Sequence, residues 1–315
     1  MPSQDTPPVY EPRRAMRSLH VPVRGLDYHV CAWGDASLVT PERPPLVMLH
    51  GWMDVGASFQ FVVDALAEVE GFERRVLAPD WRGFGRTRGQ PVDAYWFPDY
   101  LGDLDALLAH FAAEAPHGRF DLVGHSMGGN VAMSYAGARP GRIRRLANLE
   151  GYGLPRSQAS EAPRRLVRWL DSLAAPKTMP SYTSADGVAG RLMQTNPRLP
   201  RDKAYWLALH WARPDDQGRW HILGDPAHKR PNAVTYRVDE VLETWKLIAA
   251  PLLWVEAAQS NPAAWWPSRH SGPEFHQRLD VVRQVERRVL AECGHMLHHD
   301  QPHALAALLA TFLNA

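Results

Sequence analysis

The chain has 315 residues, of which 45% are hydrophobic and 22% are charged, and its formal net charge is +1. This composition is typical of a globular protein with one or two domains and a large core. The near-neutral charge and the lack of long basic runs argue against a nucleic-acid groove or a polybasic membrane patch, and no apolar stretch reaches the roughly 18 residues of a membrane span. We therefore expect neither nucleic acid nor a membrane as partner.

The start of the chain and its cysteines bear on location. Residues 1–14 are polar and rich in proline, without the apolar run of a secretory signal. Cys31 and Cys293 are isolated and show no metal-ligand spacing, which favours a reducing compartment without disulfides. The sequence therefore predicts a cytoplasmic protein and indicates neither a cofactor nor a metal.

Taken in order, the chain alternates short apolar strands with helices. Residues 18–24 and 26–32 alternate in polarity around the turn Arg24-Gly25, which predicts a hairpin. Further strands are predicted at 45–49, 76–79, 120–123, 143–149, 251–255 and 285–291, and helices at 58–69, 100–113, 130–136, 274–281 and 302–313. This rhythm predicts an α/β fold with a mostly parallel central sheet flanked by helices.

The rhythm stops at Gly151 and resumes near residue 251. Between these points lie helical fragments and many prolines, with no convincing buried strand. The sequence therefore predicts a flexible arm over residues 1–16, an α/β core over 17–150 and 247–315, and a helical insertion over 151–246.

The hexapeptide from Gly124 to Gly129 joins a predicted strand to a predicted helix, and it places Ser126 between Gly124 and Gly128. Glycines two positions before and after a serine, at a strand-to-helix junction, are the pattern of a nucleophile elbow. The tight turn holds the hydroxyl at its tip, and the following helix favours negative charge there. An ordinary glycine-rich turn would give the same pattern, so the catalytic interpretation depends on partner residues.

Motifs after several predicted strands resemble the α/β-hydrolase fold family along nearly the whole chain. They are His50-Gly51, the run from Asp80 to Thr87, the hexapeptide around Ser126, and Gly294-His295. The resemblance implies an α/β-hydrolase fold in which the insertion after strand six is a cap. It also implies that Ser126 is the nucleophile and His295 its base, and that Asp80 and Arg82 are structural.

The histidines near the carboxyl end have other interpretations. His295 could be a surface residue of a histidine-rich patch with His298 and His299. The same three residues could bind a metal, but no acid or cysteine accompanies them in sequence. The resemblance favours His295 as the base.

The third member of the triad departs from the commoner family pattern. The aspartate that most relatives carry after strand seven falls here on Ser260, and no acid occurs from Ala257 to Pro273. A serine cannot stabilise the imidazolium that forms on His295. Glu150, which follows strand six, is the preferred acid. Glu256 is the alternative, and Glu292 is a third candidate.

The remaining predicted residues surround the nucleophile. The resemblance implies an oxyanion hole made by the backbone N–H groups of Trp52 and Met127. Aromatic and neighbouring side chains line most ligand pockets, and the following residues are predicted to bind substrate: His125, Tyr152, Trp265 and Trp266.

The predicted function is that of a serine hydrolase cleaving a carboxylic ester of an apolar small molecule through an acyl-enzyme on Ser126. Thioesters, amides, lactones and carbon–carbon bonds remain alternative targets. Relatives that cleave epoxides or haloalkanes use a carboxylate nucleophile, which Ser126 replaces here. A ligand-binding protein without catalysis on the same fold is the alternative from another class.

Overall fold

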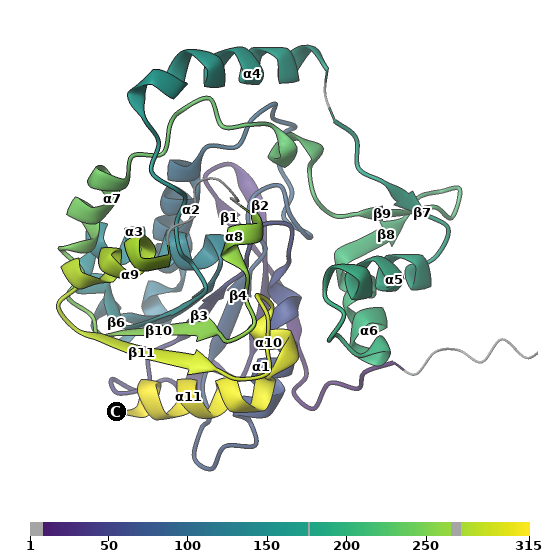
Figure 1. The fold of residues 1–315 in the computed structure, drawn as a ribbon. Coiled ribbons are helices and arrows are strands. Elements are labelled where there is room, and N and C mark those ends of the chain that lie inside the picture. Colours follow the sequence, from purple (N-terminus) through teal and green to yellow (C-terminus); the bar gives the residue numbers. More distant parts are fainter. Residues whose placement is uncertain (1–8, 176, 266–271) are drawn as a thin grey trace, which may run out of the picture.

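The computed structural model describes residues 9–175, 177–265 and 272–315. Their strands form an eight-stranded sheet in the order β1-β2-β4-β3-β5-β6-β10-β11 and a three-stranded sheet in the order β7-β9-β8 (Figure 1). The strands are β1 (Arg17–Val23), β2 (Leu26–Trp33), β3 (Leu46–Leu49), β4 (Val76–Pro79), β5 (Phe120–His125), β6 (Ile143–Leu149), β7 (Ser181–Tyr182), β8 (Ala212–Pro214), β9 (Trp220–Ile222), β10 (Leu252–Ala257) and β11 (Val285–Leu290).

The α-helices are α1 (Gln60–Leu66), α2 (Phe97–His110), α3 (Met127–Ala138), α4 (Ala162–Ala174), α5 (Ala185–Thr195), α6 (Arg201–Trp211), α7 (Val238–Trp245), α8 (Pro262–Trp265), α9 (Gly272–Arg278), α10 (Leu297–Asp300) and α11 (Pro302–Asn314). The 3₁₀ turns are η1 (Ala36–Leu38), η2 (Gly56–Phe59), η3 (Phe111–Glu114), η4 (Pro116–Gly118), η5 (Pro140–Arg142), η6 (Ala159–Glu161), η7 (Pro226–Lys229) and η8 (Leu279–Val281).

The topology of the large sheet confirms the predicted α/β fold. β1 and β2 form the predicted antiparallel hairpin, and β2 pairs antiparallel with β4. The remaining neighbours in the sheet are all parallel pairs, in the order β4, β3, β5, β6, β10 and β11. Parallel strands end at a common edge, so the residues that follow β5, β6, β10 and β11 gather there. β6 lies between β5 and β10, which brings Glu150 close to the nucleophile strand.

Alternation along the central strands assigns the two faces of the sheet. In β3, Leu46 and Met48 enter the core on the side of α1 and α11, whereas Val47 and Leu49 enter the core on the side of α2 and α3. Figure 1 shows α1 and α11 below the sheet and α2, α3 and α7 on the other side. Because both faces are covered there, the central strands β3 and β4 are continuously apolar, as the sequence predicted.

The insertion is more varied than the helical cap that the sequence predicts. It contains α4 to α6 together with the three-stranded sheet, whose strands of two or three residues are too short to give a periodic pattern in sequence. α7 lies within the predicted cap range but packs on core helix α3, with Trp245 buried in the core. The insertion is also attached to the core loop after β4, since Gly85 N–H donates to the Leu223 carbonyl and Asp225 N–H to the Gly83 carbonyl.

The end of the predicted flexible arm is attached to the core. The Tyr10 hydroxyl and the backbone N–H groups of Arg13 and Arg14 donate to the Asp64 carboxylate in α1. The Tyr10 ring also packs edge-on against Phe61. Residues 9–14 are therefore held in place by contacts that the sequence did not reveal, while residues 1–8 lie outside the described part of the chain.

Two further findings concern the described residues as a whole. None of their helices is both long and apolar enough to cross a membrane. Cys31 and Cys293 are buried and are not joined in a disulfide.

A buried charge cluster fixes the start of β5. The Asp121 carboxylate accepts hydrogen bonds from the guanidinium groups of Arg74, at 2.6 Å, and Arg144, at 2.5 Å. Asp121 and Arg74 are both fully buried. Burial raises the pKa of the Asp121 carboxyl, and the two guanidinium groups oppose that shift.

Removing the charge of Asp121 should therefore destabilise the protein. For Asp121→Asn we expect the free energy of unfolding in urea to fall by about 3 kcal/mol, because Arg74 is left buried without a counter-charge. Asp280→Asn, which breaks an exposed ion pair with Arg287, is the matched control and should cost less than about 1 kcal/mol. Equal losses in the two variants would contradict this account.

Candidate active site

Ser126 stands at a strained turn between β5 and α3. Its φ is 52°, a left-handed backbone conformation that residues with a Cβ rarely adopt. The turn is possible because its neighbours are glycines: a Cβ on Gly124 would lie 2.4 Å from the Gly128 carbonyl oxygen, and one on Gly128 would lie 2.1 Å from the Leu49 carbonyl oxygen. The sequence pattern therefore forms the predicted elbow, with the serine hydroxyl at its tip.

His295, in the loop between β11 and α10, lies against the serine. The distance from His295 Nε2 to Ser126 Oγ is 3.0 Å, and the distance from His295 Nδ1 to Glu150 Oε2 is also 3.0 Å. Nδ1–H donates to the carboxylate, which leaves the Nε2 lone pair to accept from the serine hydroxyl. The histidine is therefore oriented by one partner and able to take a proton from the other.

Glu150 supplies the carboxylate from the end of β6. Its φ is 60°, so it is a second strained residue that is not glycine, next to the first. Oε1 accepts hydrogen bonds from the Tyr152 hydroxyl and the Ala257 backbone N–H, each at 2.8 Å. Oε2 accepts from the Ser260 hydroxyl in addition to His295. These donors satisfy both oxygens of a buried carboxyl group.

Ser260 occupies the position where most relatives are expected to carry the acid. Its hydroxyl contacts the same oxygen of Glu150 that faces His295. The position is therefore still part of the site, but it donates a hydrogen bond to the carboxylate instead of supplying one. In the sequence, Ser260 stands where an acid was expected. Its contact with Glu150 depends on the pairing of β6 with β10.

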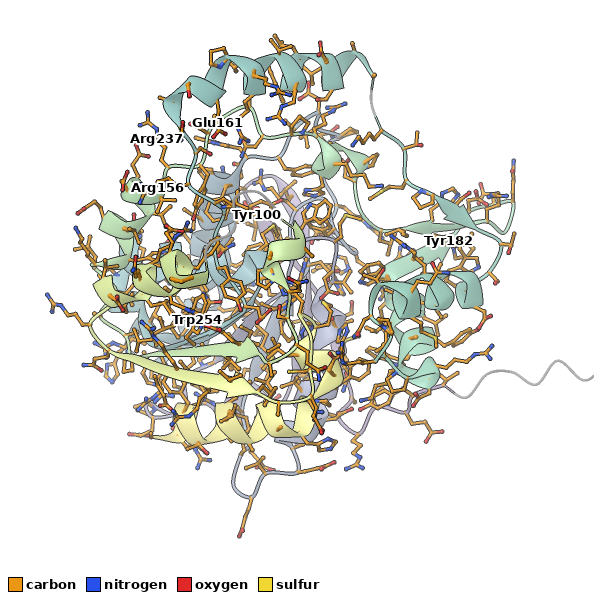
Figure 2. The ribbon with its side chains drawn as sticks, viewed as in Figure 1. Tyr100, Arg156, Glu161, Tyr182, Arg237 and Trp254 are labelled. Carbon is orange, nitrogen blue, oxygen red and sulfur yellow. The ribbon has the colours of Figure 1, made fainter. Side chains whose placement is uncertain are left out.

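The alternative acid contacts other groups. Glu256 Oε1 accepts from Trp254 Nε1 at 2.6 Å and from His276 Nε2 at 2.8 Å. Trp254 lies in β10, near the centre of the view in Figure 2. Because side chains alternate along a strand, the Glu256 side chain lies on the opposite face of β10 from that of Ala257. The backbone N–H of Ala257 contacts Glu150. Glu292 is exposed, and the structure does not bring it to His295 either.

The two predicted oxyanion donors flank the serine. Met127 is the first residue of α3, and such N–H groups have no acceptor within their helix. Among the hydrogen bonds of the described residues, neither Met127 N–H nor Trp52 N–H has an acceptor. Gly51 allows this close approach, because a Cβ there would lie 2.9 Å from His125 Nδ1 and 3.2 Å from Ser126 Cβ. Both N–H groups are thus available to a ligand beside Ser126.

Asp80 and Arg82 are structural, as the sequence predicted. The Asp80 carboxylate accepts from His29 Nδ1 and from the backbone N–H groups of Gly56 and Arg86. Arg82 forms an ion pair with Asp103, at 2.6 Å. These contacts hold the loops on which the oxyanion donor and the insertion depend.

Two predicted substrate-binding residues lie behind the site rather than in it. His125 is buried, and its Nε2–H donates to the His295 carbonyl at 2.8 Å, so it supports the histidine loop. Burial lowers the pKa of His125 well below its usual value and keeps the ring neutral. Tyr152 is also buried, and its ring packs on Trp254 while its hydroxyl holds Glu150. The positions of His125 and Tyr152 in the sequence did not reveal that their side chains are buried behind the site.

The structure describes the predicted residue Trp52 in full, Trp265 in part and Trp266 not at all. Trp52 is largely exposed at the rim of the site. Trp265 ends α8, but its side chain lies outside the described part of the structure, as does the whole of Trp266. Met53, which follows Trp52 in the chain, packs against the insertion: a Cβ on Gly224 would be 3.3 Å from the Met53 methyl and 3.4 Å from the Met179 methyl.

A cluster of buried polar residues lies beneath the site. The Ser58 hydroxyl contacts Nε2 of His298, at 3.1 Å, and Nε2 of His299, at 2.5 Å, and Asp54 lies 3.6 Å from His298. Ligand atoms of Asp54, His298 and His299 lie within 4.8 Å of one another, so these residues could hold a cation. The serine hydroxyl already joins the two imidazoles, which accounts for their orientation. His295 faces Ser126 and is not part of the cluster.

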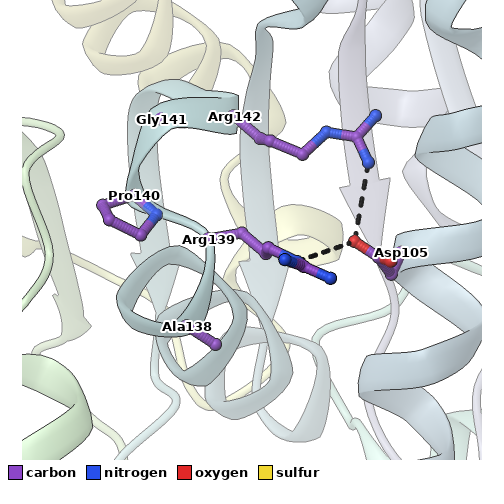
Figure 3. A pocket seen from close by; sticks show the side chains of 6 residues that line it. All are labelled: Asp105, Ala138, Arg139, Pro140, Gly141 and Arg142. Carbon is purple, nitrogen blue, oxygen red and sulfur yellow. Dashed lines mark hydrogen bonds and ion pairs between the residues drawn. The ribbon is translucent and has the colours of Figure 1, made fainter.

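A surface hollow lies apart from these residues. It has a volume of about 500 Å³ and lies around Asp105, Arg139 and Arg142, at the carboxyl end of α3 (Figure 3). Ser126 precedes the other end of this 12-residue helix, which is about 18 Å long. Both arginines pair with Asp105, at 3.4 and 3.5 Å. The hollow is therefore separate from the site.

The chain is similar to known hydrolases over most of its length. A model of the "Alpha/beta hydrolase family" matches residues 46–308. The chain is 23% identical to the serine hydrolase-like protein of Danio rerio, over 96% of this chain and 89% of that protein. It is 34% identical to the sn-1-specific diacylglycerol lipase ABHD11 of Danio rerio, over 86% of this chain and 79% of that protein. The solved thioesterase domain from the curacin biosynthetic pathway matches with a TM-score of 0.77 and 28% identity, over 94% of this chain and 99% of that chain.

The strain at Ser126 can be measured. We expect the free energy of unfolding of Ser126→Gly to exceed that of Ser126→Ala by about 1 kcal/mol, because both lack the hydroxyl but only alanine has a Cβ at φ 52°. Thermal unfolding gives the comparison. Ala307→Gly, at an exposed position inside α11, is the control and should lower stability by about 1 kcal/mol. If Ser126→Gly is no more stable than Ser126→Ala, the turn stores no strain.

Proposed function

The chain belongs to the alpha/beta hydrolase family, and we propose that it cleaves a carboxylic ester of an apolar small molecule through an acyl-enzyme on Ser126. The observation that carries the proposal is the continuous hydrogen-bonded series from Ser126 through His295 to Glu150. A serine hydroxyl is a weak nucleophile unless a base lies within hydrogen-bond reach, and His295 meets that condition.

The first half of the reaction forms the acyl-enzyme. His295 Nε2 takes the proton of Ser126 Oγ as that oxygen attacks the ester carbonyl carbon. The negative charge on the carbonyl oxygen is held by the N–H groups of Trp52 and Met127. The Glu150 carboxylate stabilises the imidazolium. His295 then gives its proton to the departing alkoxide, which leaves as an alcohol.

The second half releases the acid. Water enters where the alcohol left, His295 Nε2 takes one of its protons, and the hydroxide attacks the acyl carbon. When the tetrahedral intermediate collapses, Ser126 Oγ leaves and receives the proton from His295. The carboxylic acid departs and the hydrogen-bonded series is restored.

The proposed substrate class rests on Met53, which follows Trp52 in the chain, and on the side chains packed around it. A narrow crevice there is lined mostly by apolar residues, with one carboxylate: Met53, Asp54, Val55, Phe84, Trp211, Ile222, Leu223 and Gly224. The methyl of Met179, from the insertion, also reaches Gly224. These side chains favour an apolar acyl or alcohol group. The diacylglycerol lipase among the relatives supports an ester as the scissile bond, by its name.

Thioester cleavage is the second candidate, because the thioesterase domain is similar to nearly the whole chain. It uses the same acyl-enzyme, with a thiolate as leaving group. Matched acyl esters and acyl thioesters distinguish the two by their kcat/KM values.

Labelling by a fluorophosphonate probe tests the nucleophile. We expect the folded protein to form a covalent adduct that mass spectrometry maps to Ser126, because the probe reacts with an activated serine hydroxyl. Ser126→Ala and heat-unfolded protein should not be labelled at this peptide. A folded protein that resists labelling and does not hydrolyse p-nitrophenyl esters would favour the non-catalytic ligand-binding alternative.

Exchange of the acid tests Glu150. We expect Glu150→Gln to lower kcat on a p-nitrophenyl ester by about 10³-fold or more, because a neutral amide does not stabilise the imidazolium on His295. Glu256→Gln is the matched control and should retain kcat within a few-fold, since Glu256 contacts Trp254 and His276. Near wild-type kcat in Glu150→Gln would make the assignment wrong.

A second arm moves the acid to the position common in relatives. In Glu150→Ala the carboxylate is lost, and an added Ser260→Asp extends a carboxylate toward the place that Glu150 Oε2 occupies beside His295. We expect kcat of the double variant to be at least about tenfold higher than that of Glu150→Ala, because the new carboxylate restores part of the triad's effect. Circular dichroism of each variant checks that it folds. No recovery in a folded double variant would mean that a carboxylate at position 260 does not orient His295.

A further inference from the structure

Helix α4 differs from the other long helices of the protein. Each of the other described helices of eight or more residues buries at least two side chains, whereas α4 buries none. In Figure 1 it runs along the top of the molecule, outside the core and apart from the small sheet of the insertion. Its 13 residues are therefore not held as a helix by a core of their own.

The outward side of α4 is apolar. Leu166, Val167 and Leu170 have exposed fractions of 47%, 54% and 56%. At 3.6 residues per turn they form one strip, and the half-buried side chains of Trp169 and Leu173 continue it toward the body of the protein. Isolated exposed apolar residues are common, but a strip of three on one helix has a cost in water that a binding partner would remove.

Basic side chains border this strip. Arg164 and Arg168 follow one another by one helical turn beside Val167, and Lys177 lies just past the end of the helix. Arg164 and Arg168 form no ion pair with any residue that the structure describes. Arg165 points the other way, to Glu161 and the Asn232 carbonyl. Asp171 is exposed one turn beyond Arg168, so the arginine side of the helix carries two positive charges and one negative charge. The outward surface thus combines apolar side chains with a net positive charge.

We propose that α4 is an interfacial helix that lies on the surface of an anionic lipid aggregate. A helix with leucine and tryptophan on one face and arginine on the other inserts its apolar face among lipid chains while its cations contact the head groups. Anionic head groups supply the negative charge that Arg164 and Arg168 lack.

The attachment of α4 suits this role. Before the helix, Arg156 pairs with Asp239 of α7, and Arg165 within the helix donates to the Asn232 carbonyl. Figure 2 shows Arg156, Glu161 and Arg237 grouped near the start of α4. The helix is thus attached through its inner side and the segment before it, which leaves its apolar strip free to lie on a surface.

This inference goes beyond the proposed hydrolysis and does not depend on it. It changes the expectation from sequence that the protein has no membrane partner, because α4 would lie on a lipid surface without crossing it. If both proposals hold, the protein takes its apolar ester from that surface.

Flotation of the full chain with lipid vesicles tests the inference. We expect binding to phosphatidylcholine vesicles that contain a quarter phosphatidylglycerol, and much weaker binding to phosphatidylcholine alone. Leu166→Ser with Leu170→Ser should lower the partition coefficient at least about tenfold, because two leucines no longer enter the lipid. Arg164→Gln with Arg168→Gln should lower it about tenfold on anionic vesicles and weaken its salt dependence, since Lys177 remains.

The control is Leu247→Ser with Val289→Ser. These residues are 64% and 68% exposed on the core, so the double change removes similar exposed apolar surface and should leave binding within twofold of wild type. Equal vesicle binding by the control and the Leu166/Leu170 variant would overturn the proposal. So would a wild-type dimer in light scattering that the Leu166/Leu170 variant alone abolishes, since a second copy would then cover the strip.

A soluble p-nitrophenyl ester keeps the two proposals apart. The Leu166/Leu170 variant should hydrolyse it at the wild-type rate, because α4 holds none of the residues assigned to catalysis. A wild-type protein that binds anionic vesicles but hydrolyses no ester would leave the role of α4 intact and contradict the hydrolase. A protein that hydrolyses the ester but binds no vesicle would contradict only the role of α4.

Discussion

The contact between the Glu150 carboxylate and the His295 imidazole joins the two parts of the core that the insertion separates in sequence. It requires β6 to lie between β5 and β10, so that a residue following β6 faces both the nucleophile turn and the loop after β11. It also requires a left-handed backbone at Glu150, beside the left-handed backbone at Ser126. Two strained residues in contact with one histidine are stable only because the surrounding sheet and helices fix both of them. The geometry of the whole site therefore depends on the register of these strands.

The acid in this position is supported by its neighbours. Tyr152, Ala257 and Ser260 all donate to Glu150, and two of these donors come from β10 and the loop after it. The chain has thus kept the loop where most relatives are expected to carry an aspartate, but uses it to hold a glutamate from the adjacent strand. His125 supports the other side of the histidine loop through the His295 carbonyl. His125 and Tyr152, which were predicted to touch substrate, instead hold the His295 loop and the Glu150 carboxylate.

The insertion has two parts with different physical character. α5, α6 and the small sheet share the apolar core on the side of α1, and Trp206 packs on Phe61 there. α4 shares no such core and exposes an apolar strip bordered by arginines. The packed part contacts Met53, which follows Trp52 in the chain, whereas α4 faces outward. Cleavage and contact with a lipid surface would then be carried by separate elements of one insertion.

The sequence by itself predicted the elements of the core through local periodicity, Ser126 as nucleophile through the glycine spacing of the elbow, and His295 as its base through the resemblance to the family. The short strands, the elbow and the final Gly-His occur where they were predicted. Only the tertiary structure decided which carboxylate contacts His295, since Glu150 and Glu256 both end strands and differ in which way the side chain points. It also decided that Tyr152 lies behind the acid and that residues 9–14 are attached to α1. The amphipathic pattern of α4 is present in the sequence, but whether another element covers its apolar face depends on packing between segments far apart in the chain.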